Sequence, residues 1–428
     1  FGSSREWLSP LYLDMSPLSR TSFRGALTDV CRPDQEKELL LQTGGSLLPE
    51  EVDAVPRYLR ITGRGLRQGV SAPSLQSELH AAGWTSASVR TTLLPDFVEV
   101  WPYSANVSGL PSYQERYVVG LDLASGVAAR AVLQGLLPLE QEEFSDYIEH
   151  GPAAHCHVLD LCCAPGGKAL YMAELLGHHG SVTGVDVSQE RLTQCAGAAR
   201  RLCIHNLRLL CADAAGSPPV PVKVAGGDVH PSCWRARTLR LAACSAERAA
   251  SRAGHSEEEL RNFVAEAIGD SGKEGGEGTW HRVLVDAPCG ADASVIVQRR
   301  TLSVLRGDDN GIGQRQFEEG KEHVRGGGLA ALQQGLILAG FRALAPGGVL
   351  VYATCSFDST QNEDIVSWLL ASQGAEAQLE HVATGPVRAK RLGPDGFMAQ
   401  LTPSLSGTSG LFLACVRKIN KLDVSSFG

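Results

Sequence analysis

The sequence predicts an α/β protein in which a doubly wound, Rossmann-like sheet follows a small α+β unit. From about residue 116, short runs rich in Leu and β-branched residues alternate with helical stretches. Such runs are typical of parallel strands that are buried on both faces. Residues 57–101 instead show strand-like alternation around one short helical pattern, which indicates a separate small unit.

The predicted N-terminal unit covers residues 1–115. Its beginning is mixed and acidic, and the best helix candidate there is 27–42. Strand-like alternation follows at 57–63, an amphipathic helical pattern at 74–84 and further strand-like segments at 89–101. We therefore expect a helical lead-in followed by a small α+β domain.

The second predicted domain, residues 116–428, alternates strands with helices. Its predicted strands are 158–161, 182–187, 207–212, 282–287 and 348–355. Its predicted helices are 169–177, 190–205, 329–345 and 361–372. Because a sheet of this kind binds its ligands beyond the carboxyl ends of the strands, we expect the functional residues there.

Two stretches interrupt this alternation. Residues 215–281 contain the Pro-rich segment SPPVPVK and the Gly/Glu-rich segment GDSGKEGGEG, and residues 301–328 end in the glycine run RGGGL. Both have the composition of insertions. Such insertions could carry specificity for a partner or a substrate.

The overall composition is that of an ordinary folded protein. Of the 428 residues, 43% are apolar and 20% are charged, which excludes a disordered, collagen-like or very small protein. The formal net charge of -8 argues against binding to phosphate backbones. The charge is uneven, however, because residues 54–77 carry four Arg and no acid, and residues 382–421 carry six Lys or Arg against Asp395. These patches are either solvated surfaces or the flanks of an RNA path.

Apolar runs and cysteine spacing bear on membrane association and on the cellular compartment. No apolar run is long enough to span a bilayer, so we expect no membrane partner. The 12 Cys show no paired C-x-x-C spacings, which indicates a reducing intracellular compartment; nucleolus, cytosol and mitochondrion all fit. The sequence begins with Phe1 rather than Met, so an upstream targeting signal stays open.

A glycine loop follows the first strand of the predicted sheet. In LDLCCAPGGKAL (159–170) a strand leads into a Pro-Gly-Gly turn and then into a helix. Gly166 and Gly167 let backbone amides approach a ligand closely, and a helix start favours negative charge. The loop matches neither the G-x-x-x-x-G-K-[ST] phosphate cradle nor the G-x-G-x-x-G dinucleotide pattern. A nucleoside without phosphates is therefore the better ligand.

Two carboxylates stand at the ends of the next two predicted strands. Asp186 lies 19 residues after Gly167, where an acid accepts hydrogen bonds from both hydroxyl groups of a ribose. Asp213 ends the third strand, within reach of an adenine amino group. Either carboxylate alone is better explained as a strand-end cap. Together with the glycine loop they favour an adenosine-type ligand, and S-adenosylmethionine fits best.

Two cysteines also come just past the carboxyl ends of predicted strands. Cys289 ends the segment DAPC (286–289), and Cys355 lies in TCS (354–356). Both thiols should face the ligand pocket. Free cysteines are usually small buried hydrophobes. We assign that structural role to Cys31, Cys195, Cys203, Cys211, Cys233, Cys244 and Cys415.

A zinc site is an alternative for the residues around the first strand. The candidate ligands are His155, Cys156, His157, Cys162 and Cys163. Strand alternation argues against this site, because it sends the two His to one face of the sheet and Cys156 to the other. We therefore expect no bound metal.

A thiol beside a methyl donor suggests one particular reaction. Carbon 5 of cytosine is too electron-poor to attack a methyl sulfonium, but a thiolate that adds at carbon 6 makes carbon 5 nucleophilic. An acid or hydrogen-bond donor near the ring nitrogen stabilises the adduct, and loss of the carbon 5 proton then expels the thiolate. One cysteine suffices for the addition, and a second can assist release.

These motifs resemble those of the Sun-domain family (Nop/Sun or RsmB-like proteins), RNA cytosine-5 methyltransferases that use S-adenosylmethionine. CCAPGGK (162–168) is similar to the family's cofactor loop and VDVSQERL (185–192) to its ribose motif. DAPC and ATCS (353–356) are similar to its two cysteine motifs. The resemblance covers roughly residues 116–418 and implies a class I methyltransferase fold. PRYLRI (56–61) is similar to the start of the family's small N-terminal RNA-binding unit.

The resemblance also implies roles for single residues. It makes Cys355 the nucleophile, Cys289 the cysteine that helps to release the product, and Asp286 the group that holds the cytosine near its ring nitrogen, beside the cofactor. Lys168 either helps to orient the base or the donor, or is simply a lysine at a helix start. The cofactor-binding residues that it implies are Cys162, Cys163, Ala164, Pro165, Gly166, Gly167, Lys168, Asp186, Arg191, Asp213 and Asp286.

Three features depart from the family pattern. Gly290, Ala291 and Asp292 follow Cys289, where the family usually has Ser-Gly. Cys163 stands where Ala is usual, and the two insertions lengthen the spacing between motifs. None of these changes removes a required chemical group.

The leading interpretation is an S-adenosylmethionine-dependent RNA (cytosine-5) methyltransferase that acts on ribosomal or transfer RNA through a Cys355 adduct. The alternative is a methyltransferase-fold structural or assembly factor of a ribosomal particle with weak or no activity, whose insertions would bind ribosomal or assembly-factor proteins. Methylation of DNA or protein is a third interpretation. The order of the motifs and the second cysteine disfavour it.

Overall fold

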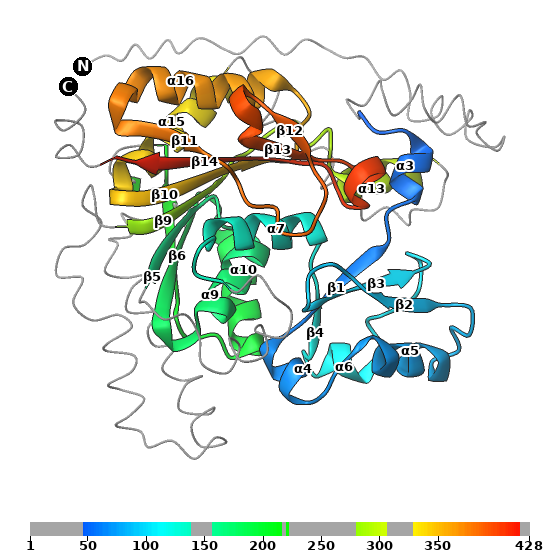
Figure 1. Ribbon diagram of the computed structural model, residues 1–428. Coiled ribbons are helices and arrows are strands. Elements are labelled where there is room, and N and C mark those ends of the chain that lie inside the picture. Colours follow the sequence, from blue (N-terminus) through cyan, green and yellow to red (C-terminus); the bar gives the residue numbers. More distant parts are fainter. Residues whose placement is uncertain (1–45, 138–155, 216–219, 222–279, 306–327, 420–428) are drawn as a thin grey trace, which may run out of the picture.

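The computed structural model shows two β-sheets with their covering helices (Figure 1). The residues that it describes are 46–137, 156–215, 220–221, 280–305 and 328–419. The helix predicted at 27–42 and most of both predicted insertions lie outside these residues. Within the described residues, no helix is both long and apolar enough to cross a membrane.

The N-terminal sheet has four antiparallel strands in the order β2-β3-β1-β4. Its strands are β1 (Arg57–Ile61), β2 (Ser88–Thr91), β3 (Phe97–Trp101) and β4 (Val118–Gly120). Its helices are α4 (Gly63–Arg67), α5 (Ala72–Ala81) and α6 (Pro111–Gln114). Helix α3 (Pro49–Asp53) precedes β1 but packs with the core of the second sheet, where Arg299 donates a hydrogen bond to the carbonyl of Val52. The strands and the helix predicted between residues 57 and 101 are confirmed. Because β4 pairs with β1, this sheet takes in residues just past 115; the division into two domains stays a prediction.

The second sheet has five parallel strands at its centre, in the order β10-β9-β5-β6-β7. These strands are β5 (Cys156–Leu161), β6 (Gly180–Asp186), β7 (Leu207–Asp213), β9 (Trp280–Asp286) and β10 (Leu344–Thr354). All five were predicted from their apolar runs. The strand order reverses beside β5, since the chain moves from β5 to β6 and β7 on one side and then to β9 and β10 on the other. Such a switch point is where α/β sheets bind ligands.

Shorter antiparallel strands extend both edges of this sheet. They are β8 (Val220–Pro221), β11 (Ala377–Glu380), β12 (Lys390–Leu392), β13 (Met398–Leu401) and β14 (Leu411–Lys418). β14 pairs with β10 and also with β11 and β13. β14 includes most of the segment TSGLFLA (408–414), which is similar to the last strand of the Sun-domain family. The other four strands are only two to four residues long, too short for a sequence pattern to reveal.

Helices cover both faces of the second sheet (Figure 1). One face packs against α7 (Leu123–Val132), α9 (Gly167–Leu176) and α10 (Gln189–Leu202), and the other against α15 (Leu329–Ala343) and α16 (Glu363–Gln373). The remaining helical segments are α13 (Val295–Leu305), α17 (Pro403–Ser406), η1 (Gly177–His179), η2 (Ser359–Gln361), η3 (Gly374–Glu376) and η4 (Pro394–Gly396). The doubly wound arrangement predicted from the sequence is therefore confirmed.

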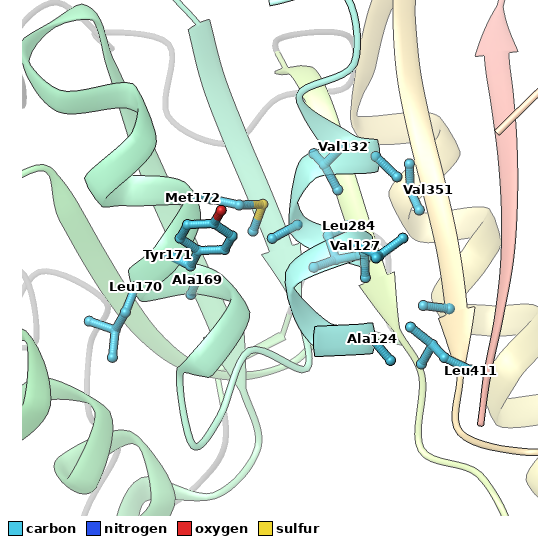
Figure 2. Close-up of a cluster of buried hydrophobic side chains, with 14 of the residues drawn as sticks. Ala124, Val127, Val132, Ala169, Leu170, Tyr171, Met172, Leu284, Val351 and Leu411 are labelled. Carbon is cyan, nitrogen blue, oxygen red and sulfur yellow. The ribbon is translucent and has the colours of Figure 1, made fainter. Parts of the chain in front are cut away.

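An apolar core between the second sheet and helices α7 and α9 holds α9 against the sheet. Val127 of α7 and Met172 of α9 pack with Leu284 of β9 and Val351 of β10, all fully buried (Figure 2). Burying each such side chain stabilises the fold by about 1.5–3 kcal/mol.

Asp122 caps the N-terminus of α7, because its Oδ1 accepts a hydrogen bond from Ala124 N at 2.8 Å.

A buried polar network joins the two sheets. Arg60 of β1 forms an ion pair with Glu174 of α9 at 2.5 Å. Arg130 of α7 donates to Tyr171 of α9 at 2.8 Å and pairs with Asp96, which precedes β3, at 3.0 Å. Helix α9 is therefore anchored to the N-terminal sheet as well as to its own sheet.

Candidate active site

Two thiols touch at the carboxyl ends of β9 and β10. Cys355 directly follows β10, and Cys289 follows β9 by three residues. The two strands are parallel neighbours, with Ala353 opposite Asp286. The Sγ atoms of Cys289 and Cys355 lie 3.2 Å apart, within hydrogen-bonding contact. The sheet thus brings together two cysteines that are 66 residues apart in sequence.

Residues that depart from the family pattern hold the two cysteine loops in register. Gly290 N donates a hydrogen bond to Oε1 of Gln361 at 2.8 Å. Phe357 N, two residues beyond Cys355, donates to Oδ2 of Asp292 at 3.0 Å. The segment after Cys289 therefore ties one loop to the other, although it lacks the usual Ser-Gly.

The contact between the thiols shifts their pKa values in opposite directions. The hydrogen bond from Cys355 lowers the pKa of Cys289, although burial alone would raise it. The same hydrogen bond, followed by burial, raises the pKa of Cys355 well above its ordinary value, and the positive charge of Lys168 opposes this rise. The two thiols therefore titrate as one coupled pair, in which Cys289 has the lowered pKa and Cys355 the raised one.

A lysine and a carboxylate lie beside the thiols. Lys168 is the second residue of α9, and its Nζ donates to Oδ2 of Asp286, the last residue of β9, at 2.7 Å. Burial is the largest single influence and would lower the pKa of Lys168, but the charge and the hydrogen bond of Asp286, together with the charges of Cys355 and Asp160, raise it overall. Lys168 is therefore a positive charge that acts on Cys355.

The glycine loop connects β5 to α9 in a conformation that only small residues allow. Cys162 has φ 74°, and the amides of Cys162 and Cys163 both donate to the carbonyl of Val185 on β6, at 2.8 and 2.9 Å. Gly166 has φ 108°, and a Cβ there would lie 2.3 Å from the Sγ of Cys195. The tight turn and this close approach both require glycine.

Asp186 braces this loop from the end of β6. Its Oδ2 accepts from Ala164 N at 3.1 Å and its Oδ1 from Ser188 N at 2.9 Å. Arg191 lies 3.8 Å from the Asp186 carboxylate and donates to the carbonyl of Ala164. A carboxylate has about four acceptor positions, so Asp186 keeps capacity for a ligand.

The remaining predicted cofactor residues lie along the same edge of the sheet. Asp213 ends β7, next to β6, and its Oδ1 accepts from Ala215 N at 2.9 Å. Pro165 and Gly167 lie in the loop and at the first position of α9. The structure therefore gathers the predicted catalytic and cofactor residues at one end of the parallel strands, while their roles stay predictions.

One residue of this region escaped the sequence analysis. Asp160 of β5 is only 1% exposed, and among the described residues neither of its carboxylate oxygens has a hydrogen-bond partner. Burial and the nearby charge of Asp286 raise its pKa well above the ordinary value. The signal that could have revealed it is a charged residue inside the apolar run VLDL (158–161).

The described part of the chain contains no group of three or more potential metal ligands. Cys156 is buried and His157 is exposed, as strand alternation requires. His155 lies outside the described residues.

Fold and site together define a Rossmann-like methyltransferase. The chain belongs to the 16S rRNA methyltransferase RsmB/F family, whose model matches residues 149–257 and 261–417. This confirms the resemblance drawn from the motifs.

Individual relatives cover parts of the chain. Ribosomal RNA small subunit methyltransferase F of Aeromonas hydrophila is 32% identical over 141 residues, which are 33% of this chain and 26% of that protein. The tRNA (cytosine(49)-C(5))-methyltransferase of Pyrococcus abyssi is 26% identical over 266 residues, 62% of each chain. The chain thus spans less than two thirds of the length of these curated relatives.

Solved structures share the fold. The crystal structure of NSun6 from Pyrococcus horikoshii with SFG has a TM-score of 0.52 at 17% identity and covers 87% of this chain and 93% of that one. A methyltransferase homologue from the same organism has a TM-score of 0.51 at 18% identity and covers 91% and 100%.

Proposed function

We propose that this protein is an S-adenosylmethionine-dependent RNA (cytosine-5) methyltransferase that works through a covalent cysteine–cytosine adduct. The observation that carries the proposal is the pair of thiols 3.2 Å apart beside the ion pair of Lys168 and Asp286. A methyltransferase that acts on oxygen or nitrogen needs no thiol at this place. The names of the relatives, which methylate ribosomal or transfer RNA, support the same activity.

The residues present fit S-adenosylmethionine. Asp186 and Asp213 end adjacent strands and would bind the ribose and the adenine, and the loop through Gly166 leaves its backbone free to approach the ligand. The described loop has no phosphate cradle, which suits a ligand whose ribose carries no phosphate. When bound, this cofactor supplies an electrophilic methyl group on a positively charged sulfur.

The side chains around the thiols have separable roles in the proposed reaction. Cys355 adds to carbon 6 of the cytosine, and the bond breaks again when carbon 5 loses its proton. Asp286 would hold the base by a hydrogen bond near the ring nitrogen, and the positive charge of Lys168, which pairs with Asp286, would offset the negative charge that the addition places on the ring. Cys289, whose pKa is lowered by Cys355, would take up the carbon 5 proton.

The direct test is transfer of tritium from labelled S-adenosylmethionine to RNA. Cys355→Ala should lower this transfer by roughly a thousandfold or more, because no other group adds to the ring. Full activity of Cys355→Ala would exclude the mechanism. Failure of the wild-type protein to bind S-adenosylmethionine in calorimetry would instead favour the assembly-factor alternative.

The release role of Cys289 has its own test. Cys289→Ala should accumulate a covalent protein–RNA adduct that survives denaturing electrophoresis, because the addition still occurs but the release slows. The double variant Cys289→Ala/Cys355→Ala is the control and should form no adduct. Normal turnover of Cys289→Ala without an adduct would contradict this role.

We propose that the N-terminal unit, residues 1–115, contacts the RNA. Of the four arginines at 54–77, Arg60 is buried in its pair with Glu174, whereas Arg64 and Arg67 are exposed on α4. Exposed arginines suit phosphate contacts. The double variant Arg64→Gln/Arg67→Gln should weaken RNA binding and flatten its dependence on salt, as measured by filter binding at several salt concentrations.

We also propose that the insertions 215–281 and 301–328 bind protein partners such as ribosomal or assembly factors. Their length and mixed charge between the catalytic motifs support this proposal. Replacing 222–279 by a short Gly/Ser linker should leave methylation of naked RNA intact and lower methylation of RNA in assembling particles. Equal loss on both substrates would overturn it.

A further inference from the structure

The carboxylates around the glycine loop outnumber the cations that face them. Lys168 is paired with Asp286, and Arg191 lies 3.8 Å from Asp186. Asp160 has neither an ion pair nor a hydrogen bond among the described residues. One buried carboxyl group of the site thus lacks a compensating partner.

A further buried carboxylate of this region, Asp122, has hydrogen-bond partners. Asp122, near Lys168, caps α7 through Ala124 N and accepts from Ser409 Oγ at 3.0 Å. The positive end of the helix stabilises its charge. Burial still raises the pKa of Asp122, so Asp160 differs from it in that neither oxygen of Asp160 has a hydrogen-bond partner among the described residues.

The strand register places Asp160 between the two site carboxylates. Asp160 lies opposite Gly184 on β6 and opposite Leu284 on β9. Asp186 and Asp286 come two residues later on those strands, so all three side chains point to the same face of the sheet. This is the face that α9 and the glycine loop cover.

Several ionisable groups face Asp160 from the elements packed against it. They are Asp186 on β6, Asp286 on β9, Lys168 on α9, Cys162 and Cys163 in the loop, and Cys195 on α10. Burial, followed by the charge of Asp286, raises the pKa of Asp160 well above its ordinary range, and only Lys168 opposes these effects. Asp160 therefore keeps its proton to a higher pH than an ordinary aspartate does.

We propose that Asp160 makes the site prefer the positively charged S-adenosylmethionine over the neutral product S-adenosylhomocysteine, by giving up its proton when the charged ligand binds. The inference rests on the proposed function. The two ligands differ only in the methyl group and in the positive charge on sulfur. A site that gains one negative charge on binding therefore stabilises the donor and leaves the spent product free to depart.

Direct contact with Asp160 is not needed for this effect. Its oxygens are covered in the protein, but charges attract each other over several ångströms where water is excluded. Binding and proton release are linked, so the affinity for S-adenosylmethionine rises with pH, at most about tenfold per pH unit, while the free protein keeps the proton. The affinity for S-adenosylhomocysteine should change far less.

Isothermal titration calorimetry of the wild-type protein tests the proposal without any activity. Titrations in phosphate and in Tris, whose ionisation enthalpies differ, give the number of protons released. We expect more protons released with S-adenosylmethionine than with S-adenosylhomocysteine, and a ratio of affinities that rises with pH. Equal proton release and a flat ratio would overturn the proposal.

Asp160→Asn removes the acid and keeps the size of the side chain. It should abolish the difference in proton release and lower the preference for S-adenosylmethionine by roughly tenfold. The amino group of the ligand contributes equally in both proteins, so the difference between them isolates Asp160. Glu380→Gln, which removes one negative charge on β11 at the far side of the sheet, is the matched control and should change neither quantity.

The outcomes separate this inference from the proposed function. A wild-type protein that binds neither ligand would contradict the proposed function. Tight binding of both ligands, with Asp160→Asn unchanged, would overturn the role of Asp160 alone. If Asp160→Asn fails to fold, the proton release of the wild-type protein still decides.

Discussion

At the scale of single residues, Cys289 and Cys355 are one titrating unit rather than two independent thiols. Their shared hydrogen bond lowers the pKa of Cys289 and raises that of Cys355. The nucleophile assigned by the family resemblance is thus the thiol with the higher pKa. Its reactivity depends on the two neighbours that shift this pKa in opposite directions, Cys289 and Lys168.

Removing Cys289 should make Cys355 more reactive. Cys289→Ala deletes the hydrogen bond that contributes most to the raised pKa of Cys355, so the thiolate fraction of Cys355 at a given pH increases. Alkylation by iodoacetamide, followed by mass spectrometry of the Cys355 peptide at several pH values, should be faster than in the wild type. The exposed Cys203 provides an internal reference in each sample. Slower alkylation of Cys355 would contradict the coupling.

Replacing Lys168 should act in the opposite direction. Lys168→Met removes the positive charge that lowers the pKa of Cys355, so that pKa rises further and alkylation at a fixed pH slows. The same peptide assay measures the effect, with Lys390→Met, an exposed lysine on β12, as the charge control. An unchanged rate for Lys168→Met would show that Lys168 exerts no influence on the thiol.

Most of these residues could be predicted from the sequence, but not how they interact. Asp286 ends an apolar strand, and Cys289 and Cys355 follow apolar strands. Because parallel strands end at the same edge of a sheet, these residues could be expected to lie close together. The contact between the thiols depends on the register of β9 and β10, which no local pattern reveals. Asp160 was missed because its neighbours in VLDL (158–161) are apolar, and a strand is predicted from such a run even when it contains one acidic residue.

At the scale of elements, the turn between β5 and α9 is the most constrained part of the site. Gly166 combines a positive φ with a close approach to Cys195. The central strands could be predicted because they are continuous apolar runs. β11, β12 and β13 could not, because they owe their extended form to pairing at the sheet edge rather than to their own residues.

Gly166→Ala should destabilise the protein and prevent cofactor binding. The positive φ costs roughly 1–2 kcal/mol and the overlap with Cys195 about 1–3 kcal/mol more. Urea unfolding measures the loss of stability. Gly83→Ala is the matched control, because Gly83 has φ 91° but a Cβ added there would meet nothing within 4 Å, so only the backbone cost applies. Equal losses of stability in the two variants would show that the side chain of Cys195 moves aside at no cost in free energy.

At the scale of the whole molecule, α9 connects the cofactor loop to the N-terminal sheet. Its first turn carries Lys168, and later turns carry Tyr171, which accepts a hydrogen bond from Arg130, and Glu174, which pairs with Arg60. Such pairs between distant segments could not be predicted, since Arg60 and Glu174 are ordinary surface residues by sequence alone. The N-terminal unit therefore contacts α9, the helix whose first turn lies at the candidate active site.

Breaking this connection should cost far more than breaking a surface pair. Glu174→Ala leaves Arg60 buried without its partner, which costs about 3–5 kcal/mol. Arg90→Ala disrupts the exposed pair with Glu99, at 3.7 Å, and should cost at most about 1 kcal/mol. Thermal unfolding compares the two. Recovery of most of the stability in Arg60→Met/Glu174→Met would show that the lone charge, not the missing contact, causes the loss.

The pairing of β9 with β10 has a consequence for how such enzymes diversify. The distance between the two sulfurs is set by the strand ladder, whereas the chain between them only has to leave one strand and return to the next. Closing a longer loop costs little, because the entropy cost grows only with the logarithm of its length. Sequence can therefore be gained or lost between the two cysteine motifs over evolutionary time while the chemistry stays the same.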